Sequence, residues 1–307
     1  MTKISVIGAG NVGATVVQRL AELELGDIVM TDIIEGLPQG KALDLMQSAP
    51  VMCYDIDITG TNDYKDIEGS DVVVVTAGLP RKPGMSRDDL LDKNASITKD
   101  VCENIATHAP DSTVITVTNP LDIMTYAALK ITGFEHNRVF GMSGVLDSSR
   151  FETFIAMELG CSVQDVNAMV LGGHGDLMVP LPQYSTVSGI PITEIMSEET
   201  INKLVKRTIH GGAEIVEHLK NGSAFYAPSA SVVKMVDSVI KDKKRILPAA
   251  AYLNGEYGLN DLYLGVPVKL GKNGVEDIIE LDLTDEQQQK LSQSGASVKE
   301  EIAKLKL

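Results

Sequence analysis

The chain has 307 residues, of which 44% are hydrophobic and 22% charged, as is usual for a globular protein long enough for two domains. Its formal net charge of −15 argues against nonspecific binding to nucleic acids and against adhesion to anionic membranes. No apolar run approaches the length of a membrane span, and no charged-then-apolar leader is present. Three scattered cysteines suggest reduced thiols. We therefore expect a cytoplasmic protein with no membrane or nucleic-acid partner.

A glycine-rich turn lies near the start of the chain. Residues 4–7 predict a buried strand, Gly8-Ala9-Gly10-Asn11-Val12-Gly13 follows, and a helical pattern continues to residue 24. A second apolar strand, residues 27–32, ends in Asp32, about 20 residues after the last glycine. The three glycines permit a tight turn, approach of a pyrophosphate to the backbone, and close packing of helix on strand. This arrangement predicts a dinucleotide site, although a strand–helix turn without a ligand remains the alternative.

Asp32 bears on which dinucleotide is bound. Its carboxylate is expected to accept hydrogen bonds from ribose hydroxyls and to repel a 2′-phosphate. The next three residues, Ile33, Ile34 and Glu35, offer no Arg or Lys for such a phosphate. The sequence therefore favours NAD over NADP.

Helical and strand patterns alternate up to residue 143. Helices are predicted over residues 40–48, 88–108 and 121–130, and strands over residues 57–61, 71–77, 113–118 and 138–140. The strand at 57–61 has the pattern of an edge strand, whereas Val72 to Val75 is continuously apolar, which is typical of a parallel strand covered on both faces. The order predicts a Rossmann-type, doubly wound parallel sheet spanning residues 1–143.

From residue 144 the pattern indicates a second, α+β domain that spans residues 144–307. Its predicted helices cover residues 147–159, 197–219 and 229–241, with a last helix after a capping box at Thr284. Its predicted strands cover residues 166–171, 180–185, 188–192, 246–253, 262–270 and 275–281. Because no disordered linker separates the halves, we expect them to pack tightly around a cleft that holds the active site.

The candidate catalytic residue is His174, within Leu171-Gly172-Gly173-His174-Gly175-Asp176. Imidazole is the side chain that most readily exchanges a proton near neutral pH, and the glycines let another molecule approach the turn. Asp147 and Arg150, three residues apart on one predicted helix, share a face. Each also has a simpler interpretation: a packed histidine, a helix cap for Asp147 and a solvated surface charge for Arg150.

Two further groups of side chains are candidates for chemistry. Arg81 and Arg87 belong to a breaker-rich loop after a parallel strand, where ligands of such sheets bind, so both can reach one small anion if the loop folds over it. His210, Glu214 and His218 recur every four residues on one helix. This spacing is not a metal signature by itself, so a solvated helix face is favoured and no metal is expected.

Taken together, these motifs resemble the lactate/malate dehydrogenase family, and most of all its lactate-dehydrogenase-like malate dehydrogenases, over nearly the whole chain. The resemblance rests on residues 8–13, Asp32, residues 76–87, Val117-Thr118-Asn119-Pro120, residues 144–150 and residues 172–176. It implies reversible hydride transfer between malate or oxaloacetate and NAD(H), within the tricarboxylic acid cycle. It also implies a homo-oligomer, with a tetramer favoured and a dimer possible.

The resemblance also implies a role for each site residue. His174 is the expected proton donor and acceptor, and Asp147 its partner, which should raise the pKa of the histidine. Arg150 is expected to hold the C1 carboxylate in a bidentate fork, and Arg87 to polarise the carbonyl. The Asn119 side chain is expected on the substrate oxygen. The expected cofactor contacts beyond the glycine loop and Asp32 are Asn94, the Val117 backbone and Asn119, and Ala224 is expected to line the substrate pocket.

Arg81 is the residue that the resemblance connects with substrate choice. Lactate dehydrogenases usually carry an uncharged Gln there, whereas a second arginine suits the extra carboxylate of oxaloacetate. Burying that carboxylate without a partner costs several kcal/mol, and pyruvate would leave Arg81 without one. A lactate or other 2-hydroxy-acid dehydrogenase is the alternative enzyme, and a non-catalytic NAD-binding protein is the alternative class.

Overall fold

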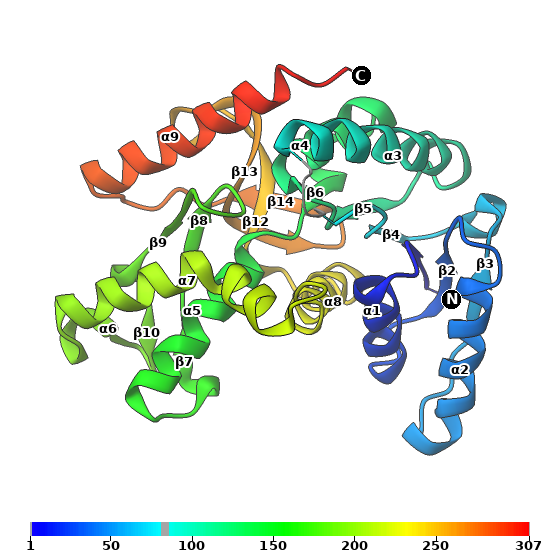
Figure 1. The fold of residues 1–307 in the computed structure, drawn as a ribbon, viewed down its shortest axis with the longest axis horizontal. Helices are drawn as coiled ribbons and strands as arrows, with labels where there is room; N and C mark the ends of the chain where they lie inside the picture. Colours follow the sequence, from blue (N-terminus) through cyan, green and yellow to red (C-terminus); the bar gives the residue numbers. More distant parts are fainter. Residues whose placement is uncertain (1, 81–85, 307) are drawn as a thin grey trace.

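The computed structural model describes residues 2–80 and 86–306 (Figure 1). The N-terminal half contributes six strands: β1 (Lys3–Ile7), β2 (Asp27–Thr31), β3 (Ile58–Thr61), β4 (Val72–Val75), β5 (Thr113–Thr116) and β6 (Val139–Gly141). They lie in the order β3-β2-β1-β4-β5-β6, and every neighbouring pair is parallel. The predicted doubly wound parallel sheet is confirmed, and β3 lies at its edge as expected.

Helices cover both faces of this sheet. They are α1 (Asn11–Glu22), α2 (Leu37–Met52), α3 (Arg87–His108), α4 (Leu121–Thr132) and, from the C-terminal half, α8 (Tyr226–Ile240). Figure 1 shows α1 and α8 on one side of the strands and α3 and α4 on the other. Val72 and Val74 belong to the core on the α1 and α8 side, whereas Val73 and Val75 belong to the core on the α3 side. The continuous apolar run of β4 is thus explained by burial on both faces.

The C-terminal half continues the same sheet. Its helices are α5 (Gly144–Leu159), α6 (Ile192–Ile195), α7 (Glu198–Leu219), α8 and α9 (Asp285–Ile302). Its strands are β7 (Val166–Asn167), β8 (Val170–Gly172), β9 (Met178–Pro180), β10 (Thr186–Val187), β11 (Ile190–Pro191), β12 (Arg245–Asn254), β13 (Asn260–Gly271) and β14 (Gly274–Ile278). Antiparallel β12 follows β6 through the pair Gly141 and Ala250, and β13, β8 and β9 follow β12. In the described part of the chain, with β14 beside β13, this sheet has eleven strands.

Several predicted elements differ from the structure, and the strand expected over residues 188–192 is reduced to β11, because Ile192 begins α6. The strand expected over residues 166–171 is divided: β7 pairs with β10 in a small separate sheet, and β8 pairs with β9 and β13 in the large one. The strand expected over residues 180–185 is wrong, because residues 182–184 form a 3₁₀ turn that starts at a proline. The helix expected over residues 40–48 begins earlier, with Pro38 in its first turn, where proline is tolerated, and ends later, at Met52.

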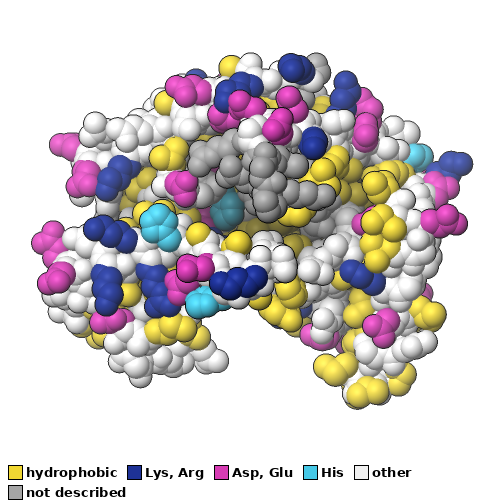
Figure 2. All heavy atoms as spheres, viewed as in Figure 1, with side chains coloured by type: hydrophobic (Ala, Val, Ile, Leu, Met, Phe, Trp, Pro, Cys, Tyr) yellow, Lys and Arg dark blue, Asp and Glu magenta, His cyan; other side chains and the backbone are white. Residues whose placement is uncertain are grey.

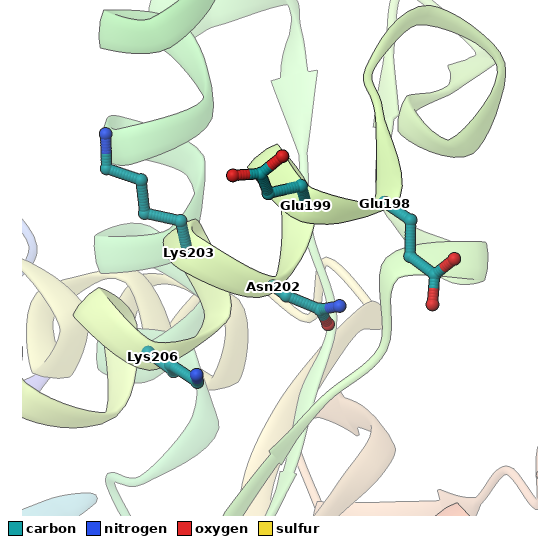
Figure 3. Close-up of a pocket in the computed structure, with 5 residues that line it drawn as sticks. All are labelled: Glu198, Glu199, Asn202, Lys203 and Lys206. Atoms are coloured by element: carbon teal, nitrogen blue, oxygen red, sulfur yellow. The ribbon is translucent and has the colours of Figure 1, made fainter.

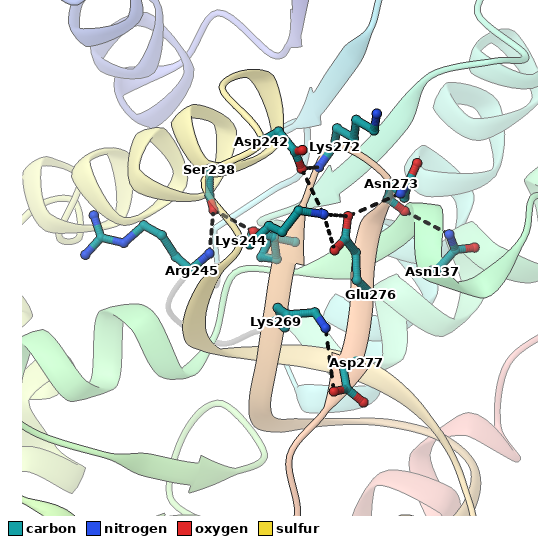
Figure 4. A network of polar contacts seen from close by, with 11 residues as sticks. Asn137, Ser238, Asp242, Lys244, Arg245, Lys269, Lys272, Asn273, Glu276 and Asp277 are labelled. Atoms are coloured by element: carbon teal, nitrogen blue, oxygen red, sulfur yellow. Dashed lines mark hydrogen bonds and ion pairs between the residues drawn. The ribbon is translucent and has the colours of Figure 1, made fainter.

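A network of polar contacts stabilises the hairpin formed by β13 and β14 (Figure 4). Lys244 lies 3.0 Å from Glu276, Lys269 lies 3.8 Å from Asp277, and Asn137 donates to the backbone carbonyl of Asn273 at 2.8 Å. These residues are on a different part of the surface from the cleft described below. Across residues 2–80 and 86–306, no helix combines the length and hydropathy that crossing a membrane requires.

Candidate active site

His174 follows β8 at a reversal of the chain. Gly172 has φ +86°, and a Cβ there would lie 2.8 Å from the carbonyl oxygen of Leu177, so the turn into β9 requires glycine. The backbone N–H of Gly173 donates to Ser294 Oγ at 2.8 Å, and that of His174 donates to Asp122 Oδ2 at 3.0 Å. The loop is therefore held by main-chain hydrogen bonds to α9 and α4, while the His174 side chain keeps 13% of its surface exposed.

Asp147 orients the imidazole of His174. Nδ1 of His174 lies 2.9 Å from Oδ2 of Asp147, and Nη1 of Arg150 lies 3.2 Å from Oδ1 of the same carboxylate. Asp147 is 2% exposed, so water screens these interactions little. Burial disfavours the imidazolium, but the charge and hydrogen bond of Asp147 outweigh it, and the pKa of His174 is raised above its ordinary value. Nε2 is then the ring atom left to exchange a proton.

A cavity of about 390 Å³ joins these residues to the N-terminal half. It is lined by residues from both halves of the chain: Val12, Val117, Asn119, Met142, Leu146, Arg150, His174, Gly175, Asp176, Met178, Ile209, His210, Gly212, Ala213, Ser223, Ala224 and Pro228. The predicted cleft between two halves thus brings Val117 and Asn119, after β5, to the same hollow as Arg150 and His174. Ala224 lines it as well.

The glycine loop has room for a phosphate group. A Cβ on Gly13 would lie 1.8 Å from the carbonyl oxygen of Gly8, so helix and strand pack as closely as the sequence predicts. A Cβ on Gly10 would meet nothing within 4 Å, and no side chain caps α1 at this residue. The amides of the first turn are thus free of side-chain partners and available to an anion. Asp32, at the end of β2, accepts from the backbone N–H of Ala9 at 2.7 Å. These residues fit a dinucleotide pyrophosphate.

The other predicted site residues are placed to different extents. Asn94 is buried, and its side-chain amide bonds the backbone of Leu79 on one side and, at 2.6 Å, the carbonyl of Asn119 on the other. It therefore fixes the backbone at Leu79 against the segment that carries Asn119. Arg81 lies outside the described residues. Arg87 begins α3, where Ser86 and Asp89 form a capping box, but its side chain also lies outside the description.

A larger hollow, about 650 Å³, lies at the start of α7 (Figure 3). Its lining side chains are all exposed: Glu198, Glu199, Asn202, Lys203 and Lys206. In Figure 2 the same helix shows lysines and arginines among acidic side chains.

Farther along α7, Glu214 pairs with Arg207 at 2.8 Å, so it has a surface partner other than the neighbouring histidines. No group of three or more His, Cys, Asp or Glu side chains that could hold a metal is found in residues 2–80 and 86–306.

Comparison with known proteins accounts for this architecture. Residues 2–141 match the NAD-binding domain of the lactate/malate dehydrogenases, and residues 144–306 match the α/β C-terminal domain of the same enzymes. The chain belongs to the lactate/malate dehydrogenase family. A malate dehydrogenase of Methanosarcina mazei is 64% identical over the full length of both chains.

Solved structures of this family agree in fold. The apo malate dehydrogenase of Picrophilus torridus aligns with a TM-score of 0.96 at 52% identity, covering 98% of this chain and 96% of that one. A lactate dehydrogenase of Cryptosporidium parvum, solved with lactic acid and nicotinamide adenine dinucleotide, aligns with a TM-score of 0.95 at 44% identity, covering 98% and 97%. Enzymes named for two different acids thus share this fold, so the fold alone does not identify the acid.

The sequence analysis did not identify three residues that support Arg150 and the glycine loop. Gly211 and Gly212 of α7 pack on Arg150, and a Cβ at Gly212 would lie 3.3 Å from its Nη2 atom. Two adjacent glycines inside a long helix were an available signal. Lys41 donates from Nζ to the carbonyl of Ala9 at 2.6 Å, which clamps the glycine loop from α2. No local pattern indicates Lys41, since the contact joins residues 32 positions apart.

Proposed function

We propose that this protein is an NAD-dependent malate dehydrogenase that interconverts malate and oxaloacetate. The observation that carries the proposal is the chain of contacts from His174 through Asp147 to Arg150, in a cleft shared with the segment from Val117 to Asn119. A proton donor, its orienting carboxylate and a cation for an acid group are the parts that reduction of a 2-oxo acid requires.

Proton transfer is assigned to His174. When bound, NADH supplies the hydride for C2 of oxaloacetate, and NAD⁺ accepts it in the reverse direction. His174 donates a proton from Nε2 to the oxygen that becomes negative, and it removes this proton when malate is oxidised. Asp147 holds Nδ1, which fixes the ring orientation and stabilises the imidazolium. We assign Asp147 this orienting role.

Substrate binding is assigned to three arginines and one asparagine. Arg150 offers its planar guanidinium to the C1 carboxylate, a bidentate geometry that lysine lacks. Arg87 polarises the substrate carbonyl, and Asn119 donates to the same oxygen. Arg81 pairs with the distal carboxylate of oxaloacetate or malate. This last pairing makes a dicarboxylate favourable and leaves an unpaired buried charge with pyruvate.

Cofactor binding is assigned to residues 8–13, Asp32, Asn94, Val117 and Asn119. The α1 amides face the pyrophosphate, and Lys41 keeps the loop in shape through the carbonyl of Ala9. The two carboxylate oxygens of Asp32 each accept one backbone N–H, from Ala9 and from Ile34. Their remaining lone pairs accept hydrogen bonds from the ribose hydroxyls. The same carboxylate disfavours NADP.

We also propose the organisation in which the enzyme works. Residues 1–143 form the NAD-binding domain and residues 144–307 the catalytic domain, and the protein acts in the cytoplasm in the tricarboxylic acid cycle. It is a homo-oligomer, with a tetramer favoured over a dimer. Hydrophobic side chains on the outer face of α2 support self-association (Figure 2), since Leu43, Val51 and Met52 are more than half exposed. The molar mass in solution, measured by light scattering, tests this point.

The decisive experiment compares kcat/KM for oxaloacetate and for pyruvate, each with NADH and with NADPH. We expect a strong preference for oxaloacetate and for NADH. A preference for pyruvate would identify the protein as a lactate dehydrogenase instead. The fold is compatible with that outcome, because a lactate dehydrogenase shares it. Binding of NADH without turnover of either acid would overturn the enzyme assignment and favour a non-catalytic NAD-binding protein.

A further inference from the structure

Asp122, in the first turn of α4, lies behind the catalytic histidine. Its side chain is buried, with 3% of the residue exposed. Oδ2 accepts the backbone N–H of His174 at 3.0 Å, and Oδ1 has no hydrogen-bond partner among the described residues. Asn119, three residues earlier, lines the cleft from the same segment. The segment from Asn119 to Asp122 thus contacts the His174 loop and also lines the cleft.

A carboxyl group in this position is costly. Burial raises the pKa of Asp122 to about 6, and the charge of Asp147 adds to this effect, while the N–H and charge of His174 oppose it. The amide oxygen of an asparagine would accept the His174 N–H without bringing a charge into the interior. The hydrogen bond alone therefore does not explain why an acid occupies this position.

The charged surroundings of Asp122 suggest what the acid does. On α5, Asp147 favours a proton on His174 and Arg150 opposes it. A cavity of about 350 Å³ beside Asp122 is lined by Asp176 of the His174 loop and by Ser294 and Glu301 of α9. The acidic groups that face Asp122 are therefore Asp147 of α5, Asp176 of the loop and Glu301 of α9. Among the described residues, Lys304 pairs with Glu301 at 2.7 Å and Arg150 pairs with Asp147 at 3.2 Å.

We propose that Asp122 is a positioning residue for His174: it fixes the main chain of the histidine, and its carboxylate acts with Asp147 to favour the imidazolium. This inference rests on the proposed function of His174 as proton donor. The two carboxylates act from different sides, since Asp147 contacts the ring and Asp122 contacts the backbone. Because the charges of Asp122 and His174 act on each other, the titration of His174 reports on both groups.

The test replaces Asp122 with asparagine, which keeps the acceptor and removes the charge. Asp71→Asn is the matched control, because Asp71 also accepts a backbone N–H, that of Lys3, at the opposite end of the sheet strands. Two readouts are compared across pH. One is kcat/KM for oxaloacetate. The other is the rate at which diethyl pyrocarbonate modifies His174 in the protein without cofactor, followed by peptide mass spectrometry, since this reagent attacks neutral imidazole.

We expect both profiles to move to lower pH in Asp122→Asn, with kcat reduced several-fold and NADH affinity unchanged. The Asp71→Asn profiles should coincide with those of the wild-type protein. Asp122→Ser, which is smaller and also neutral, repeats both measurements if the asparagine variant does not fold, and it should move both profiles in the same direction.

Unchanged profiles would overturn the inference, even with reduced kcat, because a purely structural role changes rates without moving a titration. A failure of the proposed function is distinguishable. In that case the wild-type protein itself would show no turnover, or its turnover would survive loss of the His174 imidazole. A profile that moves in both Asp122→Asn and Asp71→Asn would indicate a general effect of net charge and would also count against Asp122.

Discussion

Nδ1 of His174 lies 2.9 Å from Oδ2 of Asp147, although 27 residues separate them in the sequence. The contact exists because β8 and α5 pack side by side, as the hydrogen bond from the backbone N–H of Val170 to Ser148 Oγ also shows. It joins a residue at a strand end to a residue inside a helix. The relationship determines how the site responds to pH.

The direction of the pH dependence follows from the raised pKa of His174. Reduction of oxaloacetate consumes the imidazolium, so kcat/KM should be constant at low pH and fall as pH rises through this pKa. Oxidation of malate needs the neutral ring and should rise over the same interval. In Asp147→Asn, loss of the negative charge lowers the pKa, and both limbs should move to lower pH. Initial rates in both directions, with Asp277→Asn as a surface control, check this. Limbs that stay in place in Asp147→Asn would contradict the orienting role.

His174→Asn should abolish most turnover and leave NADH binding largely intact. Loss of one general acid costs roughly 10²- to 10⁴-fold in rate. Fluorescence titration with NADH and kcat measurement separate the two effects. His210→Asn is the matched control, because His210 lines the same cleft from α7 and should change kcat little. If His174→Asn lost NADH affinity in proportion to turnover, the residue would belong to the cofactor site.

Arg81→Gln should change which acid is reduced. Removing the partner of a distal carboxylate should lower kcat/KM for oxaloacetate roughly 10²-fold or more, while pyruvate reduction stays constant or improves. Lys82→Gln removes the charge at the next position in the sequence and should leave the ratio of the two substrates unchanged. Equal losses on both substrates in Arg81→Gln would mean that Arg81 does not select the acid.

Gly13→Ala and Gly10→Ala should separate folding from cofactor binding. The first places a Cβ 1.8 Å from the Gly8 carbonyl, so apo protein should lose stability by about 1–3 kcal/mol or more. The second meets nothing within 4 Å and should keep the wild-type unfolding temperature, but its methyl group should weaken NADH binding. Thermal unfolding and NADH titration of both variants provide the test. Equal stability of the Gly13 variant would mean that the helix can shift to make room.

Local patterns predicted most of the N-terminal half well, for identifiable reasons. Val72 to Val75 has apolar residues on both faces, and Gly8 to Gly13 must be small at fixed positions, so each signal is carried by a short stretch. The capping box predicted at Thr284 is confirmed, because it too involves residues only three apart.

The rest depends on partners that are distant in the sequence. The segment at residues 166–171 is divided between two sheets because β10 pairs with its first part, β7, and β13 pairs with its last part, β8. In the sequence, Asp122 is an ordinary acidic residue in the first turn of a helix. Its contact with the backbone N–H of His174 exists only in the folded structure. Lys41 becomes visible as a clamp only when α2 lies beside the glycine loop. Such contacts are properties of the assembled fold and leave no periodic pattern.

The continuity of the large sheet through Gly141 and Ala250 has a consequence for how the molecule unfolds. Helix α8 from the second half covers the first half's strands, and Ser229 Oγ donates to the Val12 carbonyl at 3.0 Å. Tyr263 of β13 likewise donates to the Val139 carbonyl at 2.9 Å. A fragment ending after β6 would lose this cover and expose an unpaired strand edge, a template for aggregation. The two halves should therefore melt in one cooperative transition.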